Sequence, residues 1–165
     1  MAPNLITIFQ GSAELPKALV DEYGPLTVVW VHPLVQKIKV FDLESDITLF
    51  EIKDECSIAE LLHQFGEQGI VPLSAQIRFQ LFADAELLKM LFSKWGALRT
   101  SPHEKSMTFL GTKFVDEKGA HRVLSEEHDL VQFETMLFSI EERLHKGDVV
   151  PIFNPESERI LRQIG

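Results

Sequence analysis

Residues 37–82 read KIKVFDLESDITLFEIKDECSIAELLHQFGEQGIVPLSAQIRFQLF, and the local structure of this stretch can be predicted in detail. Residues 37–42 alternate between apolar and polar side chains, and residues 47–52 mix β-branched and aromatic residues. Both patterns are typical of strands. The short polar segment 43–46 between them predicts a reversal that joins the two strands into a hairpin.

The second half of this stretch predicts a helix followed by a third strand. Ser57 and Glu60 fit a capping box at a helix start, and Gly69 can adopt the positive φ that ends a helix. The helix would have one apolar stripe, formed by Ile58, Leu61, Leu62 and Phe65. Residues 76–82 then alternate strictly between polar and apolar side chains, which predicts a strand.

This order of hairpin, helix and strand resembles the β-grasp fold of ubiquitin-like proteins. KIKVFDLESDITLFEI resembles the first hairpin of that family. CSIAELLHQFGEQGIVPLSAQIRFQLF resembles its helix, its Gly-Ile-Pro exit (here with Val71 inserted) and its third strand. A weaker echo is TFLGTKFVDEKGAHRVLS, residues 108–125. The resemblance implies an α+β protein with a β-grasp-like mixed sheet and a crossing helix, acting as a modifier or adaptor through contacts with other proteins.

The resemblance also assigns a role to the end of the sequence, because conjugated members of the family end in glycine. Gly165 would be the carboxylate that an activating enzyme adenylates, and Leu161 and Arg162 would lie in the extended tail which that enzyme reads. The residues themselves predict a helix over 155–164, since Asn154 is a good helix cap and a proline follows it. The sequence leaves helix and tail as alternatives.

Periodicity predicts further elements outside this stretch. They are strands at residues 5–9, 26–31, 107–115, 120–124 and 149–153, and helices at residues 16–22, 84–95 and 126–146. The strand at 26–31 is nearly all apolar, which predicts that both of its faces are covered. Gly111 marks a bulge in the strand that contains it. The long helix at 126–146 follows from apolar spacing, whereas the ubiquitin-like resemblance implies a strand at 134–140.

The polar stretch 99–106 is broken by Pro102 and has the composition of a linker. It would separate a β-grasp-like lobe at 1–98 from a second small α+β lobe at 107–165. The alternative is an exposed loop within one continuous domain.

Composition narrows the classes of function. The net charge of −9 disfavours nucleic acid as a partner, because an acidic surface repels phosphates. No apolar run approaches the roughly 18–20 residues that cross a bilayer. The single cysteine excludes an internal disulfide and predicts a reducing cytoplasm. We therefore expect a cytoplasmic protein with protein partners and no cofactor; the sequence does not determine its oligomeric state.

Asp42, Glu51 and Lys53 support a second hypothesis. In a hairpin centred between residues 46 and 47, Asp42 and Glu51 would lie opposite one another, so their carboxylates could share a Mg²⁺ ion while Lys53 orients a water. The surrounding order of elements resembles the core of PD-(D/E)xK nucleases, which implies a Mg²⁺-dependent nuclease. The Pro-Asp dipeptide of that family is missing, and a solvated charge pair explains the same residues.

Other catalytic constellations are not evident. Cys56 and His63 would lie on the order of 10 Å apart along one helix, beyond hydrogen-bond reach. The six histidines lack the spacing of a zinc site, and no phosphate-binding loop or nucleophile elbow is present. The sequence thus favours a binding role without excluding catalysis.

Overall fold

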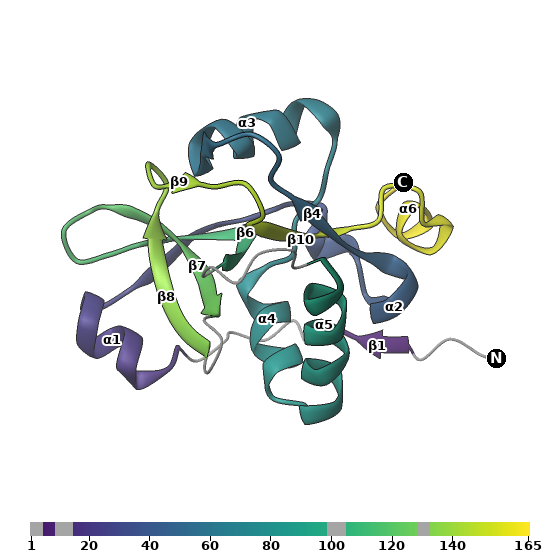
Figure 1. Cartoon of the computed structure of the whole chain (residues 1–165), viewed down its shortest axis with the longest axis horizontal. Coiled ribbons are helices and arrows are strands. Elements are labelled where there is room, and N and C mark those ends of the chain that lie inside the picture. The colour runs from purple at the N-terminus through teal and green to yellow at the C-terminus, as the bar shows by residue number, and fades with distance from the viewer. Residues whose placement is uncertain (1–4, 9–14, 99–104, 129–132) are drawn as a thin grey trace.

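A computed structural model describes residues 5–8, 15–98, 105–128 and 133–165, and it has an α+β fold (Figure 1). The helices are α1 (Lys17–Tyr23), α2 (Leu43–Asp46), α3 (Ile58–Gln68), α4 (Ala75–Phe82), α5 (Ala85–Leu98) and α6 (Glu158–Ile164), with a 3-10 turn at Val35–Lys37. The strands are β1 (Leu5–Thr7), β2 (Thr27–Val31), β3 (Val40–Asp42), β4 (Ile47–Glu51), β5 (Cys56–Ser57), β6 (Lys105–Val115), β7 (His121–His128), β8 (Phe133–Ser139), β9 (Arg143–Leu144) and β10 (Val149–Phe153).

The main sheet has the strand order β4-β10-β6-β7-β8, and β2 pairs with β6 in addition. β10 is parallel to β6, and the other pairs are antiparallel, so the sheet is mixed. Two small antiparallel pairs, β1–β3 and β5–β9, lie outside it. The main sheet therefore contains strands from both sides of residues 99–106, of which 99–104 lie outside the described residues.

Helices cover both faces of the sheet: α3 lies on one side, and α4 and α5 lie on the other (Figure 1). Successive strand residues point to opposite faces, so β10 supplies Val150 to one core and Phe153 to the other. The core under α3 includes Ile58, Leu61, Phe65, Leu110, Val150 and Ile152. The core under α4 and α5 includes Ile77, Leu81, Leu91, Trp95, Met107, Phe109 and Phe153. A third cluster brings Leu19 of α1 against Phe114, Leu124 and Leu137.

Several predicted elements are confirmed. Helix α3 begins with the predicted cap, in which Ser57 Oγ accepts from the Glu60 N–H at 3.1 Å, and ends at Gly69 with φ of +68°. Strands β1, β2, β6, β7 and β10 and helices α1, α5 and α6 form where expected, with shifted ends. Helix α6 is capped by Ser157 instead of Asn154. The pairing of β6 with β7 is irregular between Phe109 and Phe114, the segment in which we predict a bulge at Gly111.

The predicted hairpin over residues 37–52 is wrong. The segment 43–46 forms a helical turn, α2, because Asp42 caps it by accepting from the Ser45 N–H at 2.9 Å. The chain is thereby redirected, so β3 pairs with β1 and β4 pairs with β10. The two predicted strands belong to different sheets.

The predicted strand over residues 76–82 is also wrong, since this segment forms helix α4, capped by Ser74. Ile77 and Leu81 are buried at helical spacing. Arg78, which strand alternation assigned to solvent, is buried as well. A helix buried on several sides has no polar stripe, so its sequence can imitate the alternation of a strand. Of the elements that carried the ubiquitin-like resemblance in 37–82, the helix forms, whereas the hairpin and third strand do not.

The predicted long helix at 126–146 is wrong for the described part of this range, which excludes residues 129–132: the chain forms the end of β7, then β8 and β9. Strand β8 lies where the resemblance implied one. Leu137 packs into the cluster under α1, while Phe138 and Ile140 pack toward α3. Because Leu137 and Phe138 pack in different clusters on the two faces of β8, its apolar residues run consecutively instead of alternating, and their spacing then also fits a helix.

The segment Val71–Leu73, which links α3 to α4, is inserted between β10 and β6. The Leu73 N–H donates to the Pro151 carbonyl at 3.0 Å, and the Leu73 carbonyl accepts from the Gly111 N–H at 2.8 Å. The Val71 carbonyl accepts from the Phe153 N–H at 2.9 Å. This approach needs a residue without a side chain at 111, because a Cβ there would lie 2.7 Å from the backbone carbon and oxygen of Leu73.

We predict that Gly111→Ala destabilises the protein by at least about 1–3 kcal/mol, the usual cost of overpacking, because backbone on both sides must move. The urea midpoint of unfolding, followed by circular dichroism, measures the loss. Gly66→Ala in α3 is the matched control: its Cβ would meet nothing within 4 Å, and alanine stabilises a helix interior relative to glycine by about 0.5–1 kcal/mol. Equal midpoints for Gly111→Ala and wild type would show that Val71–Leu73 is not held as described.

Candidate functional site

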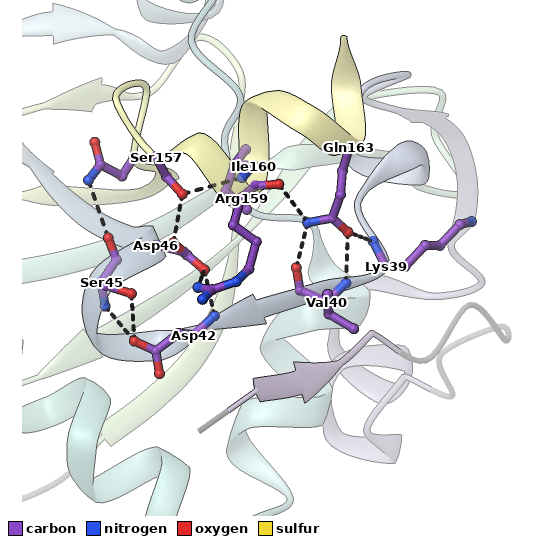
Figure 2. A network of polar contacts seen from close by, with 10 residues as sticks. Lys39, Val40, Asp42, Ser45, Asp46, Ser157, Arg159, Ile160 and Gln163 are labelled. Atoms are coloured by element: carbon purple, nitrogen blue, oxygen red, sulfur yellow. Dashed lines mark hydrogen bonds and ion pairs between the residues drawn. The ribbon is translucent and has the colours of Figure 1, made fainter. Parts of the chain in front are cut away.

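The strands at sheet edges differ in whether side chains form hydrogen bonds with the backbone N–H and C=O groups that no neighbouring strand uses. An edge strand presents a row of unpaired N–H and C=O groups on which another chain can pair. The amide of Gln163 on α6 closes β3: its Oε1 accepts from the N–H groups of Lys39 (2.7 Å) and Val40 (3.0 Å), and its Nε2 donates to the Val40 carbonyl (2.8 Å) (Figure 2). On β1, Gln80 donates to the Thr7 carbonyl at 2.5 Å.

Side chains also bond to backbone groups of β4 and β8, the strands at the two ends of the strand order. At β4, the Lys94 ammonium donates to the Ile47 carbonyl at 3.2 Å. At β8, the Leu137 N–H donates to the Tyr23 hydroxyl at 3.4 Å, and its carbonyl accepts from Arg122 at 3.3 Å. β5 and β9 are only two residues long, which itself limits pairing.

Strand β2 is different. It pairs with β6 on one side, and among the residues that the structure describes no strand pairs with its other side. Its sequence, TVVWV, contains no charge or proline. Val28 is 46% exposed and Val29 is 48% exposed, so the prediction that both faces of this strand are covered is wrong. A register shift between Val28 and Trp30 leaves Val29 out of the ladder with β6.

The side chains next to the bulge form an ordered aromatic face. The Lys113 ammonium lies 4.9 Å from the Trp30 ring centroid, a cation–π geometry, and the His32 ring packs edge-on against Trp30 at 5.5 Å. His32 Nδ1 accepts from the Leu34 N–H at 3.1 Å, and burial lowers the pKa of His32. The end of β2 is therefore fixed by a neutral histidine at physiological pH.

A cavity of about 340 Å³ opens beside the other face of β2. Its apolar wall is formed by Ile8, Val31 and Val35, and its polar wall includes Gln36, Lys39 and Gln76. Val31 belongs to β2, so the cavity and the open edge adjoin. Together they form the candidate site: a strand with exposed valines, which no described strand pairs on its outer side, next to a cavity that carries one ammonium group.

The residues of the nuclease hypothesis do not come together as predicted. Asp42 lies opposite Leu5 in the β1–β3 pair, whereas Glu51 lies opposite Val149 in the main sheet. Asp42 Oδ2 accepts from the N–H and hydroxyl of Ser45. Glu51 forms an ion pair with Lys53 at 3.4 Å. No group of three or more His, Cys, Asp or Glu suited to a metal ion occurs in the described part of the chain.

The surroundings of Cys56 and His63 do not favour a nucleophile and its base. Burial raises the pKa of the Cys56 thiol, an effect that Glu60 reinforces, and a raised pKa disfavours the nucleophilic thiolate. His63 is exposed and pairs with Glu67 on the same helix at 2.7 Å. Neither residue lines the cavity beside β2.

Leu161, Arg162 and Gly165 belong to α6 and its end, so they do not form an extended tail. The Gly165 N–H donates to the Leu161 carbonyl at 2.9 Å, and Arg162 pairs with Glu158 at 3.2 Å. Gln163 attaches this helix to β3 (Figure 2). An activating enzyme could read these residues only after α6 had left β3.

Asp46 is the second attachment point of α6 (Figure 2). Its carboxylate is buried and accepts from the Ser157 hydroxyl (2.7 Å), Arg159 (2.6 Å) and the Asp42 N–H (2.7 Å). Burial alone would raise the pKa of this carboxyl, but these hydrogen bonds and the charge of Arg159 together lower it below its ordinary value.

Arg78 and Glu126 form a buried ion pair that the sequence analysis did not predict. Arg78 Nε donates to Glu126 Oε1 at 2.7 Å, and Thr135 on β8 donates to the same carboxylate. Burial raises the pKa of Glu126, an effect that Arg78 and Thr135 oppose. The pair joins α4 to β7 and β8, and since neither residue lines the cavity, we assign it a positioning role in the fold.

Sequence periodicity gave no signal for β2 as the open edge, because a strand's partners lie elsewhere in the chain. The charge pattern of the sequence does point to Lys39, the lysine at the cavity. Residues 23–41 include Lys37 and Lys39 but no aspartate or glutamate. In a chain of net charge −9, this acid-free segment stands out.

Asp46→Asn should lower the free energy of unfolding by about 1–3 kcal/mol at pH 7, the cost of a buried group that loses charged hydrogen bonds. A carboxyl whose pKa is lowered on folding stabilises the protein above its unfolded pKa of about 3.9, and this stabilisation is lost as the pH falls through the folded value. The gap to wild type should therefore be constant from about pH 7 to 5 and shrink below about pH 4.

Urea unfolding at a series of pH values checks this, with Asp54→Asn as the control because that carboxylate is exposed. A gap that stays constant down to pH 2 would contradict the assignment of Asp46 as an ionised anchor.

None of the helices in the described residues is long and apolar enough to cross a membrane. Comparison with protein-family models, with curated proteins and with solved structures found no match. The relationship to ubiquitin-like proteins therefore stays a prediction.

Proposed function

We propose that this protein is a non-catalytic adaptor that binds an extended segment of a partner protein by adding it as a strand to the open edge of β2. One observation carries the proposal: side chains bond to backbone groups of β1, β3, β4 and β8, while β2 has no described strand on its outer side. Strand addition is a common mode of peptide recognition, in which backbone hydrogen bonds supply affinity and side-chain pockets supply specificity.

The exposed valines support this use of the edge. Burying a valine side chain is worth on the order of 1.5 kcal/mol, so a strand that covers Val28 and Val29 gains apolar contact as well as backbone pairing. Trp30 and Lys113 lie beside them and provide a rigid neighbouring surface.

Among the functions implied by the ubiquitin-like resemblance, the geometry supports an adaptor better than a conjugated modifier. Conjugation through Gly165 requires a free tail, and α6 is attached to β3 by Gln163 and to α2 by Arg159. A Mg²⁺-dependent nuclease would need Asp42 and Glu51 to converge. We place the adaptor in the cytoplasm, which the single, unpaired Cys56 supports.

Selection from a displayed library of random seven-residue peptides tests the proposal. Peptides that bind wild type should shift the backbone amide resonances of residues 27–31 in heteronuclear NMR spectra, because they pair with β2. Val29→Lys should weaken their binding at least tenfold, since an edge lysine opposes pairing.

Val20→Lys is the matched control, because it places the same charge on another exposed valine, in α1. It should leave binding within about twofold of wild type, and urea unfolding of both variants verifies that they are folded. Binders whose shifts fall outside β2, or that tolerate Val29→Lys, would overturn strand addition.

A further inference from the structure

The cavity beside β2 adjoins the path that an added strand would take. Val31 forms part of its wall, and side chains directly opposite one another in neighbouring strands lie about 4.5–5.5 Å apart on the same face. A partner residue opposite Val31 would therefore point toward the cavity. At about 340 Å³, the cavity has room for one long side chain.

Lys39 and Gln76 are two of the residues with hydrogen-bond donors that line this cavity. The Lys39 ammonium donates to the Gln36 carbonyl at 3.0 Å, which uses one of its three N–H groups. Gln76 Oε1 accepts from the Thr112 hydroxyl at 3.2 Å, so the donor end of this amide is directed elsewhere. In the described residues, no acceptor is within hydrogen-bond distance of that donor end.

The segments around β2 are basic in a chain that is acidic as a whole. Residues 23–41 and 105–115, which contain β2 and the strand it pairs with, include Lys37, Lys39, Lys105 and Lys113 but no acidic residue. Asp116 and Glu117 follow Val115, which pairs with Thr27 at the end of β2 away from Val31 and the cavity. The chain as a whole carries −9, so a second copy would meet overall repulsion, whereas a local acidic group would meet attraction.

We propose that the occupant of β2 is an acidic extended segment of another protein, one of whose carboxylate side chains enters the cavity and binds Lys39 and Gln76. This inference rests on the proposed function, since the segment must first pair with β2. It adds the chemistry of recognition: strand addition holds the backbone, and the carboxylate selects the sequence. Part of the cavity wall is apolar, so the methylene groups of the entering side chain can pack against it. Glutamate has one more methylene group than aspartate and therefore fits better.

The experiment uses the peptides selected on the full-length wild-type protein as probes. They should carry glutamate at one fixed position. Replacing that glutamate by glutamine should weaken binding to wild type about tenfold, measured by fluorescence polarisation of the labelled peptide. Lys39→Met removes the ammonium but keeps an aliphatic side chain, and on this variant the same replacement should change affinity less than twofold. Lys37→Met, a nearby exposed lysine that is absent from the cavity wall, should retain the tenfold difference.

The two proposals fail separately in this design. Binders that do not shift the amide resonances of residues 27–31 overturn both. Binders that pair with β2 but show no preference for glutamate, or that lose the same affinity with Lys39→Met as with Lys37→Met, overturn only the acidic anchor. A wild-type dimer in sedimentation velocity that Val29→Lys dissociates would mean that a second copy occupies β2 and would overturn the acidic segment.

Discussion

Leu73 donates to one central strand and accepts from another, so the backbone between α3 and α4 is itself part of the sheet. This placement has consequences on both sides of the sheet. The chain leaves α3 on one face, passes between β10 and β6, and begins α4 on the other face. The three residues Val71–Leu73 thus connect the two cores. They can pass this close to β6 only because residue 111 is a glycine, which has no side chain to collide with the Leu73 backbone. The pairing of β6 with β7 is irregular in the same segment of β6, between Phe109 and Phe114.

The strand edges show a second organising feature. A protein with several short strands has many unpaired backbone groups, and such groups promote association with other chains. Here side chains from helices bond to some of these groups: Gln163 from α6, Gln80 from α4 and Lys94 from α5. Helices that cover a face thus also protect an edge. The exposed β2 contrasts with this arrangement, and the contrast is the basis of the adaptor proposal.

The position of α6 shows how one packing interaction decides between functions. The same residues, Leu161 to Gly165, could in principle form an extended tail or a helix. Asp46 and Gln163 hold them as a helix against β3, through bonds between residues more than 100 positions apart in the chain. The buried, ionised Asp46 has a cost in desolvation that its three donors offset, so the attachment is specific in geometry as well as favourable.

Local chemistry in the sequence determined the start and end of α3 and the positions of β6 and β10. Ser57 and Gly69 bound α3 as predicted, and β6 and β10 form where their apolar residues predict. These features depend on residues within a few positions of each other, so a single sequence is sufficient to predict them. The same holds for the acid-free segment that contains Lys39.

Only the tertiary structure decided which strands pair with each other. It also decided the structure of segments whose apolar spacing fits both a helix and a strand. Residues 76–82 form a helix that buries Ile77 and Leu81 and pairs Arg78 with Glu126, and 133–139 form a strand that pairs with β7. The cavity beside β2 combines Val31 of this strand with Ile8, with residues of the segment 35–39 and with Ser74 and Gln76 at the start of α4. Such a site depends on contacts between distant segments, which the pattern of any one segment does not contain.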